Sequence, residues 1–182
     1  MRRLLTFLLL VLAACVYAQE APSKEKQSLE WSEITNNDGC YRVSFPTSWS
    51  VSLIGSDGDD VQAISPAEDA GDLHFENVVI WVEPLAEAYS STQYYQLSIK
   101  NLESRSRSFT LLDEGQRKVD GREARWFHAK LQQGGVWGEI LQVQILFNGR
   151  VYILDCTAEP GKMEQYLPLF HQIIDSFQID CG

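Results

Sequence analysis

The alternation of apolar and polar residues is most regular over Gly121–Ala158, where three apolar-rich runs are joined by two short turns. The dipeptide Asn148-Gly149 separates the second run from the third. Asn-Gly is typical of a two-residue hairpin turn, because both of its central residues can adopt positive φ. In such a hairpin Val143 lies opposite Leu154, and successive side chains alternate between the two faces of the ribbon. The pattern predicts an antiparallel meander with one apolar face and an opposite face that is only partly covered.

Shorter apolar runs before the meander predict further strands. Asn77–Glu83 is apolar on both faces, which favours a central position in a sheet. The other runs alternate, which indicates strands with one buried face. They are Tyr41–Phe45, Trp49–Leu53, Val61–Ser65 and a longer run from Phe109 to Val119.

Two stretches carry the three- and four-residue spacing of an amphipathic helix. The first is predicted over 91–105, because Ser90 and Gln93 have the spacing of a capping box. The second has one continuous apolar face, and Pro168 inside it predicts a kink or a helix start near Tyr166. Its apolar residues are Met163, Tyr166, Leu167, Phe170, Ile173, Ile174 and Phe177. Together these elements predict an α+β fold, in which helices cover an antiparallel sheet with a C-terminal meander.

The chain begins with a segment that is typical of an exported protein. Arg2-Arg3 precede the apolar run Leu4–Ala14, which is too short to span a bilayer and resembles a secretory signal. The next residue, Cys15, completes a run that resembles the lipobox of bacterial lipoproteins, in which the cysteine thiol is lipidated. Ordinary cleavage after Ala18 is the alternative. We therefore expect a signal peptide over 1–14, a lipid anchor and flexible tether over 15–37, and a folded domain over 38–182.

The chain carries a strong negative charge. Fifteen basic and 25 acidic residues give a net charge of −10, and removing residues 1–14, which contain two arginines and no acid, changes it to −12. Nucleic acid and anionic lipid surfaces attract proteins of the opposite sign. We therefore expect no nucleic acid as a partner, and contact with the membrane through the lipid anchor.

The four cysteines have different expected fates. Cys15 is assigned to lipid. Cys156 falls in mid-strand on the apolar face opposite Leu141, where a thiol behaves as a small buried hydrophobe. Cys40 precedes the first strand and Cys181 follows a short terminal edge strand, so antiparallel neighbours would bring their Cα atoms within the roughly 4.4–6.8 Å of a bridge. We predict a Cys40–Cys181 disulfide, with Cys156–Cys181 as the alternative.

Candidate chemistry is sparse. Asp72, His74 and Glu76 alternate, so a strand that began there would project all three from one face, as metal ligands require; a solvent-facing strand surface is the alternative. The acidic turn Gly55–Asp60 matches no EF-hand spacing and indicates a solvated loop. His128 falls near the apolar face, and spacing assigns it no carboxylate or nucleophile, so we expect a structural histidine. We expect no metal and no cofactor.

Five segments resemble, in order and spacing, the PsbP-like domains. The first is Asp38–Trp49, in which an aromatic strand ends in a proline and a tryptophan follows shortly. The others are Asn77–Ile80, Val119–Ala124, Gly149–Ala158 and Ile174–Phe177. The resemblance covers the chain from Asp38 to Ile179, and it implies an α/β/α sandwich of the Mog1/PsbP type.

The resemblance also implies a function. PsbP-like proteins are non-enzymatic extrinsic proteins that bind a membrane complex, which for photosynthetic members is photosystem II at its lumenal side. The sequence contains no P-loop, G-x-G-x-x-G, G-x-S-x-G, H-E-x-x-H or C-x-x-C motif. We expect a membrane-tethered interaction or assembly module on the extracytoplasmic side of a bacterial membrane, which is the thylakoid lumen side if the source is cyanobacterial. A small-ligand or metal carrier that uses the space between sheet and helix is the alternative, and a pocket lined by Trp126 and Cys156 would favour it.

Overall fold

Ten strands and two helices are formed by the residues that the computed structural model describes, which are 29–55, 60–72 and 76–180. Neighbouring strands are antiparallel throughout this part of the chain. The elements are β1 (Trp31–Asn36), β2 (Tyr41–Pro46), β3 (Ser50–Ile54), β4 (Asp60–Ile64), β5 (Asn77–Pro84), α1 (Ser91–Arg105), β6 (Ser108–Val119), β7 (Arg122–Gln133), β8 (Val136–Phe147), β9 (Arg150–Ala158), α2 (Met163–Ser176) and β10 (Gln178–Ile179).

The meander has the register that its turn residues predict. Val143 pairs with Leu154, and the pairing continues to Phe147 opposite Arg150. Asn148 and Gly149 have φ values of 48° and 71°, as a hairpin turn with two left-handed residues requires. The prediction of the β8–β9 hairpin is confirmed.

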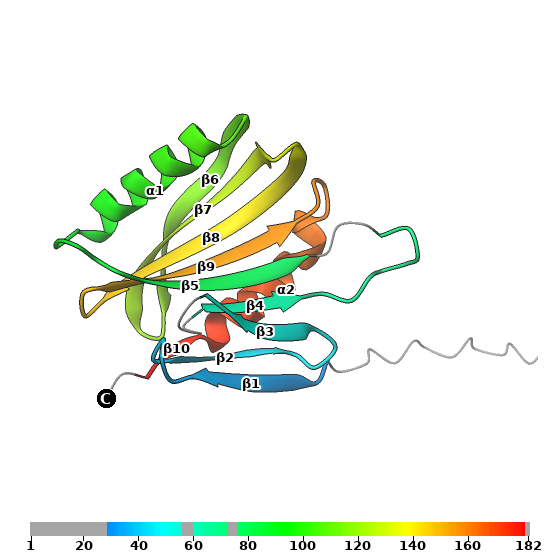
Figure 1. Ribbon diagram of the computed structural model, residues 1–182, viewed down its shortest axis with the longest axis horizontal. Coiled ribbons are helices and arrows are strands. Elements are labelled where there is room, and N and C mark those ends of the chain that lie inside the picture. The colour runs from blue at the N-terminus through cyan, green and yellow to red at the C-terminus, as the bar shows by residue number, and fades with distance from the viewer. Residues whose placement is uncertain (1–28, 56–59, 73–75, 181–182) are drawn as a thin grey trace, which may run out of the picture.

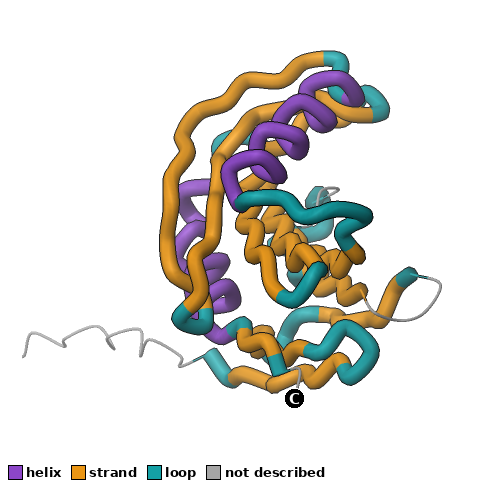
Figure 2. The backbone as a smooth tube through the Cα atoms, turned by 90° about the vertical axis from the view of Figure 1, so that its left-hand side faces the viewer, coloured by secondary structure: helices purple, strands orange, loops and turns teal. Residues whose placement is uncertain are grey.

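The strands form two sheets that enclose α2. The larger sheet has the order β3-β4-β5-β9-β8-β7-β6, and the smaller one the order β1-β2-β10. Helix α1 packs on one face of the larger sheet over β6, β7 and β8, whereas α2 contacts β9 of the larger sheet and β2 of the smaller one. Figures 1 and 2 show the larger sheet curving past both helices, with the smaller sheet beneath. The expected α+β fold with helices covering an antiparallel sheet is confirmed.

The main core lies between α2 and the apolar face of the meander. Phe170, Ile173 and Ile174 of α2 are fully buried, as are Tyr152 and Leu154 of β9. These residues belong to one contiguous cluster that also includes side chains of the smaller sheet. The apolar faces of helix and sheet that the sequence predicts therefore meet as expected.

Two boundaries differ from the sequence prediction. Helix α2 begins at Met163 and continues through Pro168, so a start near Tyr166 is wrong. Strand β1 lies inside the expected tether and pairs with β2 along its whole length, so the folded part begins before residue 38. After Pro46 the chain passes from one sheet to the other, because β2 belongs to the smaller sheet and β3 to the larger one.

The ends of the domain meet in the smaller sheet. Strand β10 pairs with β2, and the Asp180 N–H donates to the Cys40 carbonyl over 2.9 Å. This antiparallel neighbourhood is the premise of the predicted Cys40–Cys181 disulfide. Cys181 itself lies outside the described residues, so both that bridge and its alternative with Cys156 stay predictions. The Cys156 side chain is fully buried in the main core.

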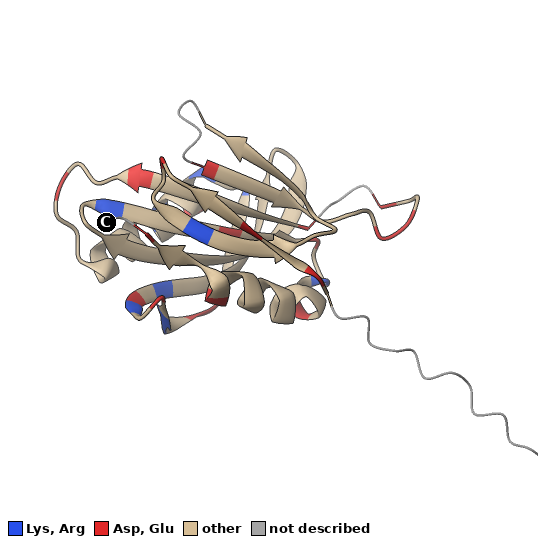
Figure 3. Cartoon of the chain, turned by 90° about the horizontal axis from the view of Figure 1, so that it is seen from below, with Lys and Arg blue, Asp and Glu red and all other residues tan. Residues whose placement is uncertain are grey.

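The expected signal peptide over 1–14 and the lipidation site Cys15 also lie outside the described residues. Within the described part, neither helix has the length and apolar character needed to cross a bilayer. Seen from below, acidic and basic residues are interspersed over the smaller sheet and the helix beside it (Figure 3).

Candidate functional site

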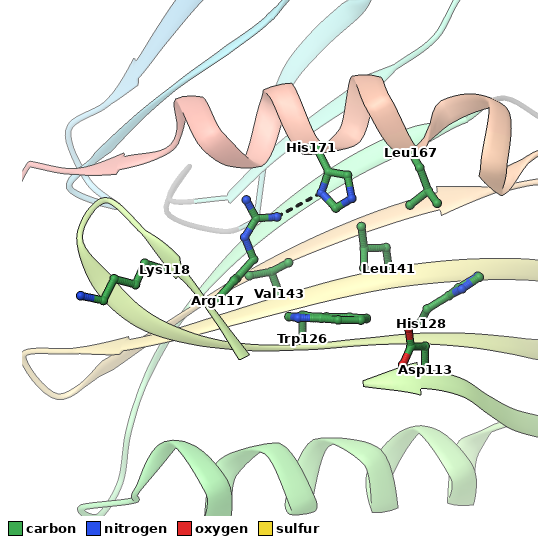
Figure 4. A pocket seen from close by; sticks show the side chains of 9 residues that line it. All are labelled: Asp113, Arg117, Lys118, Trp126, His128, Leu141, Val143, Leu167 and His171. Atoms are coloured by element: carbon green, nitrogen blue, oxygen red, sulfur yellow. Dashed lines mark hydrogen bonds between the residues drawn. The ribbon is translucent and has the colours of Figure 1, made fainter. Parts of the chain in front are cut away.

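A groove of about 440 Å³ opens between α2 and the strands β6, β7 and β8. We call it the Trp126 groove. Its apolar floor and wall consist of Trp126, Leu141, Val143 and Leu167, whereas its polar residues are Asp113, Arg117, Lys118, His128 and His171. Figure 4 shows Leu167 and His171 on α2 above the sheet residues Trp126, Leu141 and Val143, with Lys118 at the rim pointing away from Trp126.

The floor of the groove depends on a glycine. Trp126 on β7 pairs with Gly115 on β6, and a Cβ atom at position 115 would lie 2.9 Å from the indole ring. Real Cβ atoms do not approach a ring so closely. The indole can therefore lie against the β6 backbone only because residue 115 has no side chain.

One end of the groove is held by an arginine. Arg117 on β6 forms an ion pair with Asp175 on α2, and its Nη1 lies 3.0 Å from His171 Nδ1. Because a guanidinium only donates, His171 Nδ1 must accept, which places the imidazole proton on Nε2. Burial and the Arg117 charge lower the pKa of His171 below its ordinary value, and Asp175 opposes them. His171 is therefore a neutral hydrogen-bond donor at neutral pH.

The other end of the groove is acidic. His128 on β7 pairs with Leu141 and so lies on the apolar face, as expected, and its Nε2 lies 3.3 Å from a carboxylate oxygen of Glu139 on β8. Sequence spacing assigned no carboxylate to His128, and the structure supplies Glu139 as its partner. Asp113 on β6 lies directly across the strand pair from His128. The groove thus joins an end with Arg117 to an end that carries carboxylates, across an apolar floor.

The lining of the groove combines apolar walls with a few polar groups. The described residues that line it include no serine, threonine or cysteine that the two histidines could activate as a nucleophile. A groove of this size with apolar walls and a few polar groups is typical of a binding site. It can hold a planar or apolar group on Trp126 and orient charged groups at its two ends.

The metal candidates of the sequence do not form a site in the described structure. Strand β5 begins at Asn77, so the alternation expected from Asp72 does not apply. Asp72 accepts a hydrogen bond from the Glu68 N–H in a turn, whereas the Glu76 side chain is fully buried beside Ser65. His74 lies outside the described residues. Among the described residues no three His, Cys, Asp or Glu side chains are grouped as metal ligands.

Sequence reasoning missed the polar part of the groove. Arg117 lies 54 residues from His171 and 58 from Asp175, so no local spacing connects them. The close approach of Gly115 to Trp126 follows from the β6–β7 register, which a bulge shifts between Leu111 and Asp113. Only the register of β6 could have revealed this contact.

Comparison with known proteins relates the chain to one family. The PsbP family model matches residues 30–179, which includes both sheets and both helices. No curated protein matches the chain.

Three solved structures are similar to the chain. The solution structure of cyanobacterial PsbP (CyanoP) from Synechocystis sp. PCC 6803 has a TM-score of 0.58 and 13% identity, covering 88% of this chain and 98% of that one. LpqN of Mycobacterium tuberculosis, described as involved in cell envelope biogenesis, has a TM-score of 0.64 and 12% identity, with coverages of 85% and 92%. The Ran-binding protein Mog1p of Saccharomyces cerevisiae has a TM-score of 0.59 and 9% identity, with coverages of 84% and 96%. At these identities the similarity shows a shared fold.

Proposed function

Because the chain belongs to the PsbP family, we propose that it is a non-enzymatic binding module, tethered to the extracytoplasmic side of a membrane, that docks on a membrane protein complex. The Trp126 groove carries this proposal. It provides an aromatic surface between two charged ends, and its described lining holds no nucleophile next to either histidine.

The groove has the composition of an interface hot spot. Tryptophan and arginine dominate the binding energy of protein interfaces, in pockets from which water is excluded on binding. A volume of about 440 Å³ accommodates one or two apolar side chains of a partner segment. An acidic residue beside that anchor would meet Arg117 and Lys118. Lys118 lies at the rim with its ammonium turned away from Trp126, so it would meet a longer partner segment (Figure 4).

The membrane location of the proposal rests on the N-terminus and the family. Cys15 follows an apolar run that resembles a lipoprotein signal. Two similar structures belong to a cyanobacterial PsbP and to a protein involved in cell envelope biogenesis. If the source is phototrophic, photosystem II is the complex we expect as the partner, and the lumenal side of the thylakoid membrane is the expected location.

Co-purification from detergent-solubilised membranes tests the docking. Lys118 is exposed at the groove rim, so Lys118→Glu reverses a rim charge without disturbing the core. Lys100 is exposed on α1, on the other side of the larger sheet, so Lys100→Glu is a matched control with the same change in net charge. We expect the tagged wild-type chain and the control to retain the same membrane complex and Lys118→Glu to lose it. Equal recovery by both variants would contradict docking at this groove.

A small-ligand carrier is the second candidate, and the position of Trp126 favours it. Trp126 lines a groove between the sheet and α2, as a carrier requires, although Cys156 is fully buried and does not line it. Native mass spectrometry of the purified chain distinguishes the two functions. A stoichiometric bound molecule that is lost in Trp126→Leu would establish the carrier, whereas a protein that carries no bound molecule beyond the lipid expected at Cys15, with an intact membrane partner, supports the docking module.

A further inference from the structure

A second groove lies on the opposite face of the larger sheet, between α1 and the strands β5, β8 and β9. We call it the α1 groove, and its volume is about 410 Å³. The residues that line it include Trp81, Glu83, Leu97, Arg105, Gln142 and Asp155. The α1 groove shares no lining residue with the Trp126 groove.

The walls of the α1 groove include large apolar side chains that remain exposed to solvent. The apolar stripe of α1 packs on β7 and β8 through Tyr95, Ile99 and Leu102. Trp81 on β5 lies beyond this contact and is 37% exposed, and Leu97 on α1 is 39% exposed. An indole and a leucine therefore face solvent within the same groove.

The floor of the α1 groove is a carboxylate held in place by a hydrogen-bond network. Gln142 Nε2 donates to Asp155 over 2.6 Å, and Ser98 Oγ on α1 donates to Gln142 Oε1 over 2.8 Å. Burial raises the pKa of Asp155 to about 6, while hydrogen bonds from Gln142 and Trp81 oppose that rise. Asp155 is therefore ionised at neutral pH, although it lies in a partly desolvated position.

A second carboxylate increases the negative charge of the groove. Glu83 lies two residues from Trp81 on β5 and accepts a hydrogen bond from the Tyr94 hydroxyl over 3.1 Å. Arg105 is the basic residue in the described lining, and the ion pairs of the described residues involve neither Asp155 nor Glu83. The groove thus holds two carboxylates beside an exposed indole with one guanidinium at its rim.

We propose that the α1 groove binds an organic monocation, an ammonium group carried on an apolar or aromatic body. The ammonium would donate to Asp155 and lie against the indole of Trp81, because a cation is attracted both by a desolvated carboxylate and by the face of an aromatic ring. The apolar body would cover Leu97. A metal ion fits less well, because the described residues provide no group of three metal ligands here and the walls are apolar. The net charge of −10 favours cations over anions as ligands.

Calorimetric titration of the full-length chain in non-ionic detergent tests the proposal. The probes are phenylethylammonium and 2-phenylethanol, which share the aromatic body and differ in charge. We expect the ammonium to bind about tenfold more tightly than the alcohol at pH 8, as a charge-assisted hydrogen bond combined with a cation–π contact allows. Equal affinities, or no saturable binding of the ammonium, would overturn the proposal.

Three variants locate the binding. Asp155→Asn keeps an acceptor for Gln142, and Trp81→Leu removes an exposed ring, so neither disturbs the core; each should weaken ammonium binding roughly tenfold. Trp137→Leu is the matched control, because Trp137 on β8 is 43% exposed, like Trp81, but does not line the groove. Unchanged affinity in both Asp155→Asn and Trp81→Leu, or an equal loss in Trp137→Leu, would show that the cation binds elsewhere.

The pH dependence separates Asp155 from its neighbours. Ammonium affinity should fall as the pH drops through about 6, because Asp155 then takes up a proton. The other charged or titratable groups that face it are Glu83 on β5 and Tyr94 and Arg105 on α1. Tyr94 stays neutral between pH 8 and 5, because burial raises its pKa above the ordinary value. The fall should persist in Glu83→Gln and vanish in Asp155→Asn; the reverse pattern would contradict the assignment.

Discussion

Trp126 lies against the backbone of Gly115, and a methyl group at position 115 would lie 2.9 Å from the ring. Gly115→Ala should therefore displace the indole and destabilise the fold by about 1–3 kcal/mol, as overpacking does. Gly138→Ala on β8 is the control, because a Cβ there meets its nearest neighbour at an ordinary 3.6 Å. Urea unfolding of the two variants measures the difference. Equal stabilities would show that the indole does not need the glycine.

His171 provides a residue-level test of the electrostatics. Burial and Arg117 lower the pKa of His171, and Asp175 raises it. An NMR titration, assigned with His171→Gln, should give a pKa below 6.5, and Asp175→Asn should lower it further. Because the unfolded chain binds the proton more readily, His171 makes stability fall as the pH drops from 6.5 to the folded pKa. A pKa above 6.5 would contradict the Arg117–His171 hydrogen bond.

Single residues show where sequence reasoning ends. The face on which His128 lies follows from the alternation along β7, and the structure confirms it. Its contact with Glu139 depends on how far each side chain reaches across the β7–β8 pair, which the pattern of apolar positions does not determine. The same limit applies to Arg117 and Asp175, whose meeting requires the position of α2 over the sheet.

At the scale of elements, the packing of α2 on β9 is the contact on which the core depends. Leu154 and Phe170 are both fully buried in the main cluster. Leu154→Ala or Phe170→Ala should each cost about 2–5 kcal/mol, because each leaves a cavity as well as losing apolar contact. Chemical denaturation measures these losses. Losses below about 0.5 kcal/mol in both variants, the range of ordinary surface substitutions, would mean that these faces do not pack together.

Elements with local signals were predicted well. The Asn148-Gly149 turn determined the register of β8 and β9, and the capping box of Ser90 and Gln93 determined the start of α1. Strand β1 has no alternating pattern, since its partly buried residues, Trp31 and Ile34, are three apart. Its strand conformation comes from pairing with β2, which local sequence does not encode. Helix α2 starts before Pro168 although this proline has no N–H to donate to the Glu164 carbonyl, because the buried apolar face of the helix offsets the one lost hydrogen bond.

At the scale of the whole molecule, the sequence predicted which helices and strands are present better than it predicted which strands are neighbours. The run of apolar strands and two amphipathic helices indicated a helix-covered antiparallel sheet, which the structure has. The separation of β2 from β3 into different sheets was missed. The alternation of apolar and polar residues along a strand indicates which of its faces is buried, but it does not indicate which strand lies beside it. The smaller sheet joins both ends of the domain through β1 and β10.

The anchor is a property of the whole chain and can be tested separately from the groove. If Cys15 is lipidated, the protein should partition into the detergent phase. Two or more acyl chains would also hold it stably on a membrane. Cys15→Ala should move it to the aqueous phase or leave its precursor unprocessed. Phase partition followed by mass spectrometry of the N-terminal peptide measures this, and unchanged membrane fractionation of Cys15→Ala would show that the cysteine is not the anchor.

Photo-crosslinking in intact cells tests docking at the Trp126 groove most directly. A photoreactive residue replaces Lys118 at the groove rim in one strain and Lys100 on α1 in another, both exposed positions that the core does not need. We predict that irradiation links position 118 to a subunit of a membrane complex, that position 100 gives no such product, and that Trp126→Leu weakens the product at 118. The same crosslinked subunit from both positions, or none from position 118, would contradict the proposal that this groove is where the protein binds its partner.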